Sequence, residues 1–245
     1  MIQAFDKKVI ISGDSIEYYE YKKPIVRGYR RRARKKRERK EGTEQEQLKK
    51  MQSSVNRTRT AIRRLVQTNP QLTKFLTLTC TMTDLRQANK EFNLFTQRMK
   101  DRFSEFQYLA VIEFQKDIDF HGNAKPDGGA VHYHVLCQLR YVPATEIGLD
   151  IWKHGGIDIE RPKGSMWGYI SKYIQKDMTD RRMFGKKKYF CSQDLKRPAE
   201  FVQDDAIFFM EAVQKDLLLR SEDTFYNDYT GEVSRKVFHH KKGAI

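Results

Sequence analysis

Residues 131–139, VHYHVLCQL, alternate apolar and polar side chains, and this alternation predicts a half-buried β-strand. The side chains predicted to enter a core are Val131, Tyr133, Val135, Cys137 and Leu139. The opposite side of the strand carries His132 and His134, named here the histidine pair. Because side chains at positions i and i+2 of a strand point the same way, we expect both imidazoles on one polar sheet face.

Two other stretches alternate in the same way and are expected to flank this strand. Residues 108–115 direct Glu113 to a polar face, and residues 74–82 (KFLTLTCTM) direct Thr77 and Thr79 to one. If the strands pair as antiparallel neighbours, the carboxylate and the histidine pair converge on one patch. Two nitrogens and one oxygen, with open coordination positions, suit a catalytic divalent ion such as Mg²⁺ or Mn²⁺. Two histidines on a solvated strand face are the alternative.

A third stretch, residues 165–177 (SMWGYISKYIQKD), has helical spacing. At 100° per residue, Tyr169 and Tyr173 lie on one flank of this helix. Lys172 and Lys176 each follow a tyrosine by three residues. The pattern suits tyrosine chemistry on a phosphate, and an ordinary amphipathic helix with boundary tyrosines is the alternative.

The charge of the chain is concentrated in one segment. Lys and Arg number 47 against 32 Asp and Glu, which gives a formal net charge of +15. Residues 27–40 (RGYRRRARKKRERK) hold ten basic residues and one acidic residue. Such a run is typical of a polyanion-binding arm, because cations near phosphates release condensed counterions. A solvated helix face and a nuclear localisation signal are the alternatives. The predicted DNA-contacting residues are Arg30, Arg31, Arg32, Arg34, Lys35, Lys36 and Arg37.

Length and composition indicate a globular domain with arms rather than a fibrous or disordered chain. The chain has 245 residues, of which 39% are hydrophobic, and only 6 are Pro. It contains no apolar run of the roughly 20 residues that a membrane span needs. Three widely spaced cysteines fit neither a disulfide scaffold nor a zinc knuckle, so a reducing compartment is expected.

The predicted organisation has four parts. Residues 1–26 form a strand hairpin that joins the main domain, and residues 27–68 form a basic helical arm. The main domain spans residues 69–220. Residues 221–245 form a C-terminal edge hairpin or tail around Thr230 and Gly231.

Three motifs in order resemble those of the rolling-circle replication initiator (Rep) proteins of the HUH endonuclease superfamily, found in plasmids and single-stranded DNA phages. They are FLTLT at 75–79, HYH at 132–134 and YISKYIQK at 169–176. The resemblance covers roughly residues 70–180. It implies an α+β fold with a central antiparallel sheet of about five strands, of the ferredoxin/RRM-like kind. Helices are then expected on one face of the sheet and the active site on the other.

The resemblance implies metal-dependent nicking and rejoining of single-stranded DNA. A tyrosine attacks the scissile phosphate, which gives a 5′-phosphotyrosine and a free 3′-hydroxyl. The implied metal ligands are the histidine pair and Glu113, with His121 in reserve. Lys172 or Lys176 would orient the phosphate. The sequence suits either tyrosine, and we predict that Tyr173 attacks first and Tyr169 second.

The implied partners are single-stranded DNA at a replication origin and host replication proteins. The chain contains no GxxxxGK[ST] motif, so a host helicase would be recruited, together with a polymerase. A bacterial cytoplasm is the expected location. Two alternatives are a non-catalytic protein that binds single-stranded nucleic acid and an HUH relaxase or transposase.

Overall fold

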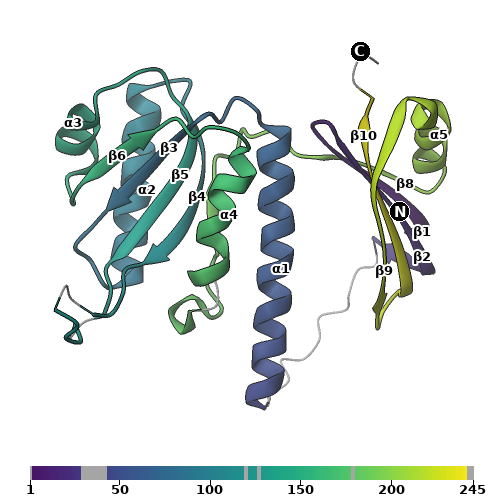
Figure 1. The fold of residues 1–245 in the computed structure, drawn as a ribbon, viewed down its shortest axis with the longest axis horizontal. Helices are drawn as coiled ribbons and strands as arrows, with labels where there is room; N and C mark the ends of the chain where they lie inside the picture. Colours follow the sequence, from purple (N-terminus) through teal and green to yellow (C-terminus); the bar gives the residue numbers. More distant parts are fainter. Residues whose placement is uncertain (1, 29–42, 119–120, 126–127, 178–179, 242–245) are drawn as a thin grey trace. The chain divides into compact units, whose positions relative to one another are not determined.

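The computed structural model describes residues 2–28, 43–118, 121–125, 128–177 and 180–241 (Figure 1). The chain divides into two compact units, which we describe separately. The motif unit is Thr43–Leu195, and the terminal unit combines Met1–Gly42 with Lys196–Ile245. The predicted DNA-contacting residues between Arg30 and Arg37 lie outside the described residues.

The motif unit is built on a five-stranded antiparallel sheet of order β6-β3-β5-β4-β7, which confirms the predicted α+β fold. The strands are β3 (Lys74–Thr79), β4 (Gln107–Phe114), β5 (Val131–Gln138), β6 (Ile157–Glu160) and β7 (Tyr189–Cys191). β5 is the central strand, between β3 and β4. The stretch VHYHVLCQL therefore lies in the middle of the sheet.

One face of this sheet packs on α2 (Leu85–Arg102), with α3 (Ala144–Glu146) and the π-helical η1 (Ile147–Trp152) beside it. The Asp84 side chain caps α2 by accepting a hydrogen bond from the Gln87 backbone N–H at 2.8 Å. The rings of Phe92 and Tyr133 stack with centroids 4.2 Å apart. The core here therefore consists of the apolar side of β5 and the apolar stripe of α2.

We expect Phe92→Ala to destabilise the motif unit by about 3–5 kcal/mol, because it empties a fully buried aromatic site. Urea unfolding followed by tryptophan fluorescence measures this loss. Both tryptophans of the chain lie in the motif unit, so the signal reports on that unit alone. The exposed Lys90→Ala on the same helix is the control and should change stability by less than about 0.5 kcal/mol. Equal midpoints for the two variants would contradict this packing.

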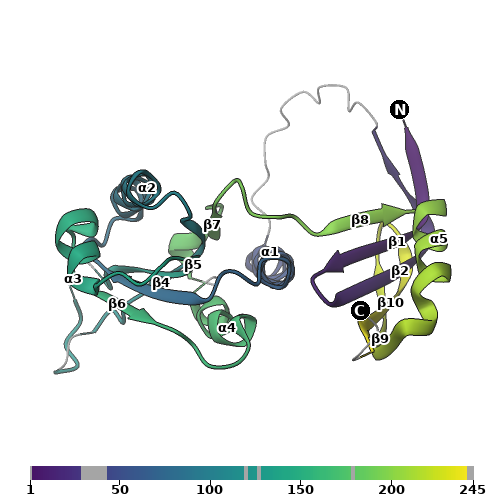
Figure 2. The same ribbon diagram turned by 90° about the horizontal axis from the view of Figure 1, so that it is seen from above.

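The other face of the sheet, which carries the histidine pair, is named here the site face. Two helices, α1 (Glu44–Thr68) and α4 (Met166–Asp177), pack on part of it. Figure 2 shows α2 and α4 on opposite sides of the sheet. The apolar residues that this cluster takes from the sheet are Phe75, Leu109, Val111 and Leu136. Helices therefore cover both faces, unlike the predicted arrangement, because these apolar side chains need cover.

Helix α1 differs from the predicted arm of residues 27–68. Its first residue is Glu44, and the Thr43 hydroxyl accepts a hydrogen bond from the Glu46 backbone N–H at 3.3 Å. Val55 and Ile62 of α1 are buried in the same cluster as Ile174 of α4. The helix is therefore part of the motif unit rather than an arm.

The terminal unit has its own five-stranded antiparallel sheet of order β8-β1-β2-β10-β9. Its elements are β1 (Gln3–Ser12), β2 (Ser15–Arg27), β8 (Ala199–Val202), α5 (Asp204–Val213), the 3₁₀ turn η3 (Gln214–Asp216), β9 (Leu217–Asn227) and β10 (Gly231–His240). The structure contains both predicted hairpins. However, the hairpin β1–β2 pairs with β8 and β10 rather than with the motif sheet. The predicted main domain of residues 69–220 therefore extends past the end of the motif unit.

None of the helices in the described ranges is long and apolar enough to cross a membrane.

Candidate active site

The register of the motif sheet brings the predicted metal ligands together on the site face. Thr79 pairs with His132, which pairs with Glu113 across β3, β5 and β4. The next row on that face contains Thr77 opposite His134. The antiparallel pairing expected from the sequence therefore produces the expected convergence.

His134 is buried, with 3% of its surface exposed, and both of its ring nitrogens have partners. Its Nε2 lies 2.5 Å from Glu113 Oε2, and its Nδ1 lies 3.3 Å from Thr77 Oγ1. These two contacts fix the orientation of the imidazole. Thr77 thus orients the second histidine, as a partner behind a metal ligand does.

His132 carries an unpartnered nitrogen. Its Nε2 is buried and has no hydrogen-bond partner among the described residues. Burial lowers the pKa of His132, and the neighbouring His134 and Lys125 lower it further, while Glu113 opposes them. The ring is therefore held in the neutral form, which is the form that binds metals.

The donor set of the histidine pair and Glu113 fits a divalent cation by chemistry, since it offers two imidazole nitrogens and one carboxylate. The unpartnered nitrogen of His132 fits the same interpretation. In the part of the chain that the structure describes, no group of three such side chains is arranged to hold a metal ion. The reason is that Glu113 and His134 are hydrogen-bonded to each other. The reserve ligand His121 is exposed in the connection between β4 and β5.

Tyr173 lies directly against the histidine pair. Its ring stacks on that of His134, with centroids 3.7 Å apart and planes 26° apart. Phe75 stacks on its ring as well, at 5.5 Å. Burial raises the pKa of Tyr173, and Glu113 and Glu160 raise it further, whereas a hydrogen bond with Tyr169 lowers it.

Tyr169 has a different environment, although it is one helical turn away. Its hydroxyl donates a hydrogen bond of 2.5 Å to Glu160 Oε2, and this bond is the main cause of its raised pKa. Its ring centroid is 6.2 Å from that of Tyr173. The Lys172 ammonium lies 5.0 Å from the Tyr169 ring centroid. The side chain of Lys176 lies outside the described residues.

Sequence reasoning missed two carboxylates of β6. Asp158 pairs with Thr77 and Glu160 pairs with Phe75, so both belong to the site face. A hydrogen bond joins the two carboxyls, and burial together with Glu160 raises the pKa of Asp158. The alternation Ile-Asp-Ile-Glu at residues 157–160 was the available signal, because it predicts that both acids share one face.

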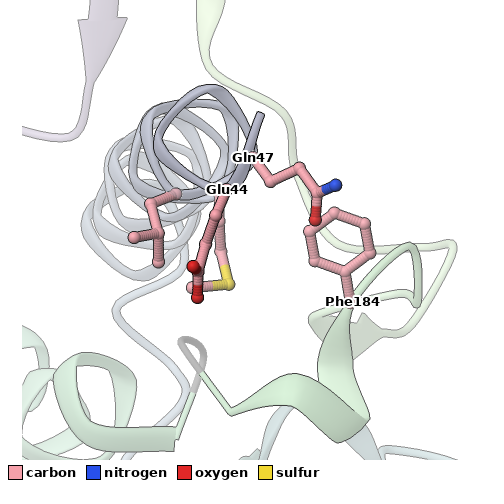
Figure 3. Close-up of a pocket in the computed structure, with 5 residues that line it drawn as sticks. Glu44, Gln47 and Phe184 are labelled. Carbon is pink, nitrogen blue, oxygen red and sulfur yellow. The ribbon is translucent and has the colours of Figure 1, made fainter. Parts of the chain in front are cut away.

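The structure also has a pocket of about 440 Å³ between the start of α1 and Phe184 (Figure 3). Phe184 directly follows the 3₁₀ turn η2 (Arg181–Met183). The residues that line the pocket are Glu44, Gln47, Leu48, Met51 and Phe184. None of these comes from the three sequence motifs, so the candidate chemistry is assigned to the site face.

Residues 73–178 match the model of a family described as replication-associated protein ORF2. The match spans β3 to α4 and includes the histidine pair, Glu113 and both tyrosines. It confirms the predicted resemblance to Rep-type replication initiators for this segment, which is somewhat less than half of the chain. Neither the curated proteins nor the solved structures include a significant match to the chain.

Proposed function

We propose that the chain is a rolling-circle replication initiator that nicks and rejoins single-stranded DNA through a 5′-phosphotyrosine. One observation carries the proposal: the Tyr173 ring stacks on His134, 3.7 Å between centroids, next to the unpartnered nitrogen of His132. A nucleophile beside a set of metal-ligand side chains, in a segment that matches a replication-associated family, supports this chemistry. Origin DNA, a host helicase and a host polymerase are the proposed partners.

The residues have separate roles in the proposed reaction. The Tyr173 oxygen forms a bond to phosphorus while the bond from phosphorus to the 3′-oxygen breaks, so the 3′-oxygen leaves and is protonated. The histidine pair and Glu113 would hold a divalent ion, Mg²⁺ or Mn²⁺, which when bound supplies electrostatic stabilisation of a non-bridging phosphate oxygen. Lys172 is exposed on α4 beside Tyr169 and supplies positive charge for the phosphate.

The aryl phosphate ester explains why rejoining needs no nucleotide cofactor. Attack by a 3′-hydroxyl on the phosphotyrosine forms one phosphodiester and releases one phenol. The number of ester bonds to phosphorus is therefore conserved, and the exchange runs in either direction. A protein with two tyrosines can hold one strand on each during successive transfers, which suits Tyr169 and Tyr173.

Incubation of the full chain with single-stranded circles carrying the cognate origin tests the proposal. With Mn²⁺ we expect a covalent protein–DNA species on denaturing gels, and with EDTA a rate lower by about 100-fold or more, since metal stabilisation is worth several kcal/mol. The double variant Tyr169→Phe/Tyr173→Phe is the matched control, which should bind DNA without forming the adduct. Tight binding without an adduct in Mn²⁺ would instead favour a non-catalytic binding protein.

A further inference from the structure

Glu160 is a carboxylate in contact with the reacting atom of one tyrosine. It lies on β6, which pairs with β3, so a strand of the sheet holds its backbone in place. Its Oε2 accepts a hydrogen bond of 2.5 Å from the Tyr169 hydroxyl. A group at this distance from a phenol hydrogen satisfies the geometric requirement for a general base. Tyr173 lies instead with its ring on His134.

Asp158 makes Glu160 better suited to accept a proton. The two acids are two residues apart on β6, and the hydrogen bond between them raises the pKa of Asp158. Carboxyls this close do not both ionise readily, so they share a proton. With the proton on Asp158, Asp158 donates to Glu160, and Glu160 keeps the negative charge that a base needs. Asp158 is thus a positioning residue for Glu160.

We propose that Glu160 is the general base for Tyr169 and does not serve Tyr173. This inference rests on the proposed function and deepens it, because it divides the two tyrosines between two proton-accepting environments. It also gives a reason for retaining Tyr169 where a single nucleophile would suffice for one cleavage. The second strand transfer would use Tyr169 and its dedicated base.

The step balances as a proton transfer coupled to substitution at phosphorus. The Tyr169 oxygen bonds to phosphorus, and the bond from phosphorus to the 3′-oxygen breaks. The phenol proton moves to Glu160 Oε2, and the leaving 3′-oxygen takes a proton from water. In the reverse direction Glu160 returns its proton to the departing phenolate, so no oxidant, reductant or nucleotide is consumed.

Glu160→Gln tests the proposal in two backgrounds of the full chain, with Mn²⁺ and cognate single-stranded DNA. In Tyr173→Phe, where Tyr169 is the remaining nucleophile, we expect adduct formation to slow by about 100-fold or more, since general bases contribute that much. In Tyr169→Phe, where Tyr173 remains, the rate should change by less than about 3-fold. Glu222→Gln in the terminal unit is the matched control and should leave both rates unchanged.

A fluorinated tyrosine at position 169 separates a base from a merely structural side chain. Ring fluorine lowers the phenol pKa, so attack then depends less on a base. We expect fluorotyrosine to reduce the loss caused by Glu160→Gln by about 5-fold or more, whereas a packing defect would persist.

Each remaining outcome has a distinct meaning. If Glu160→Gln slows both backgrounds equally, or neither, the assignment of Glu160 is overturned. If Tyr173→Phe forms no adduct at all while Tyr169→Phe does, Tyr169 is not a nucleophile, and the inference fails while the proposed function stands. If the unsubstituted chain forms no adduct, the proposed function itself fails.

Discussion

Tyr173→Phe should slow formation of the first covalent protein–DNA adduct by at least about 10³-fold, because removal of a catalytic nucleophile has effects of that order or larger. The substitution deletes one oxygen and keeps the ring that stacks on His134 and Phe75. The fold should therefore be unaffected, and DNA binding should be retained. Single-turnover kinetics in Mn²⁺ measures the rate, and the residual adduct should map to Tyr169.

The matched control is Tyr141→Phe, in the same unit. Tyr141 is 85% exposed and belongs to none of the motifs, so its substitution should leave the rate unchanged. If Tyr173→Phe reacts at the unsubstituted rate and Tyr169→Phe does not, the order of the two tyrosines is reversed. If the double variant still forms the adduct at full rate, tyrosine chemistry is wrong altogether.

His132→Ala should lower the cleavage rate by more than about 100-fold, since even mutations behind a metal ligand cost 10–100-fold in affinity or activity. The His132 Nε2 makes no hydrogen bond within the described residues, so this substitution breaks no bond of that atom. Loss of activity without loss of fold is therefore expected. Calorimetric titration with Mn²⁺ alone should show that the variant binds the ion more weakly.

Glu113 and His121 distinguish between the two versions of the third ligand. Glu113→Ala should weaken Mn²⁺ binding as His132→Ala does, whereas His121→Ala should leave it unchanged. The reverse pattern would replace Glu113 by His121 in the ligand set. Unchanged Mn²⁺ binding in all three variants would contradict the proposed metal site.

The sequence predicted the geometry of the site because alternation along strands is a local property. Residues 131–139 indicated which side chains share a face, and antiparallel pairing then brought Glu113 opposite His132. Helical spacing likewise predicted that Tyr169 and Tyr173 share a flank. The structure adds that Tyr173 alone stacks on His134, which requires the packing of α4 on the sheet.

Features that depend on distant pairing were not predicted. The hairpin β1–β2 was identified, but its pairing with β8 and β10 joins the two ends of the chain and leaves no local signal. The sequence also did not reveal the cover on the site face, because Val111 and Leu136 are apolar positions within faces that were judged polar by their histidines and glutamate. Glu160 was missed because β6 has only four residues.

The most direct test of the account is mass analysis of the protein after cleavage of cognate single-stranded DNA in Mn²⁺, followed by nuclease and protease digestion. The account predicts one nucleotide-bearing peptide that contains residues 169–173, modified at Tyr173 in the first turnover and absent in EDTA. A modification outside this peptide, or tight DNA binding with no modified peptide at all, would contradict it.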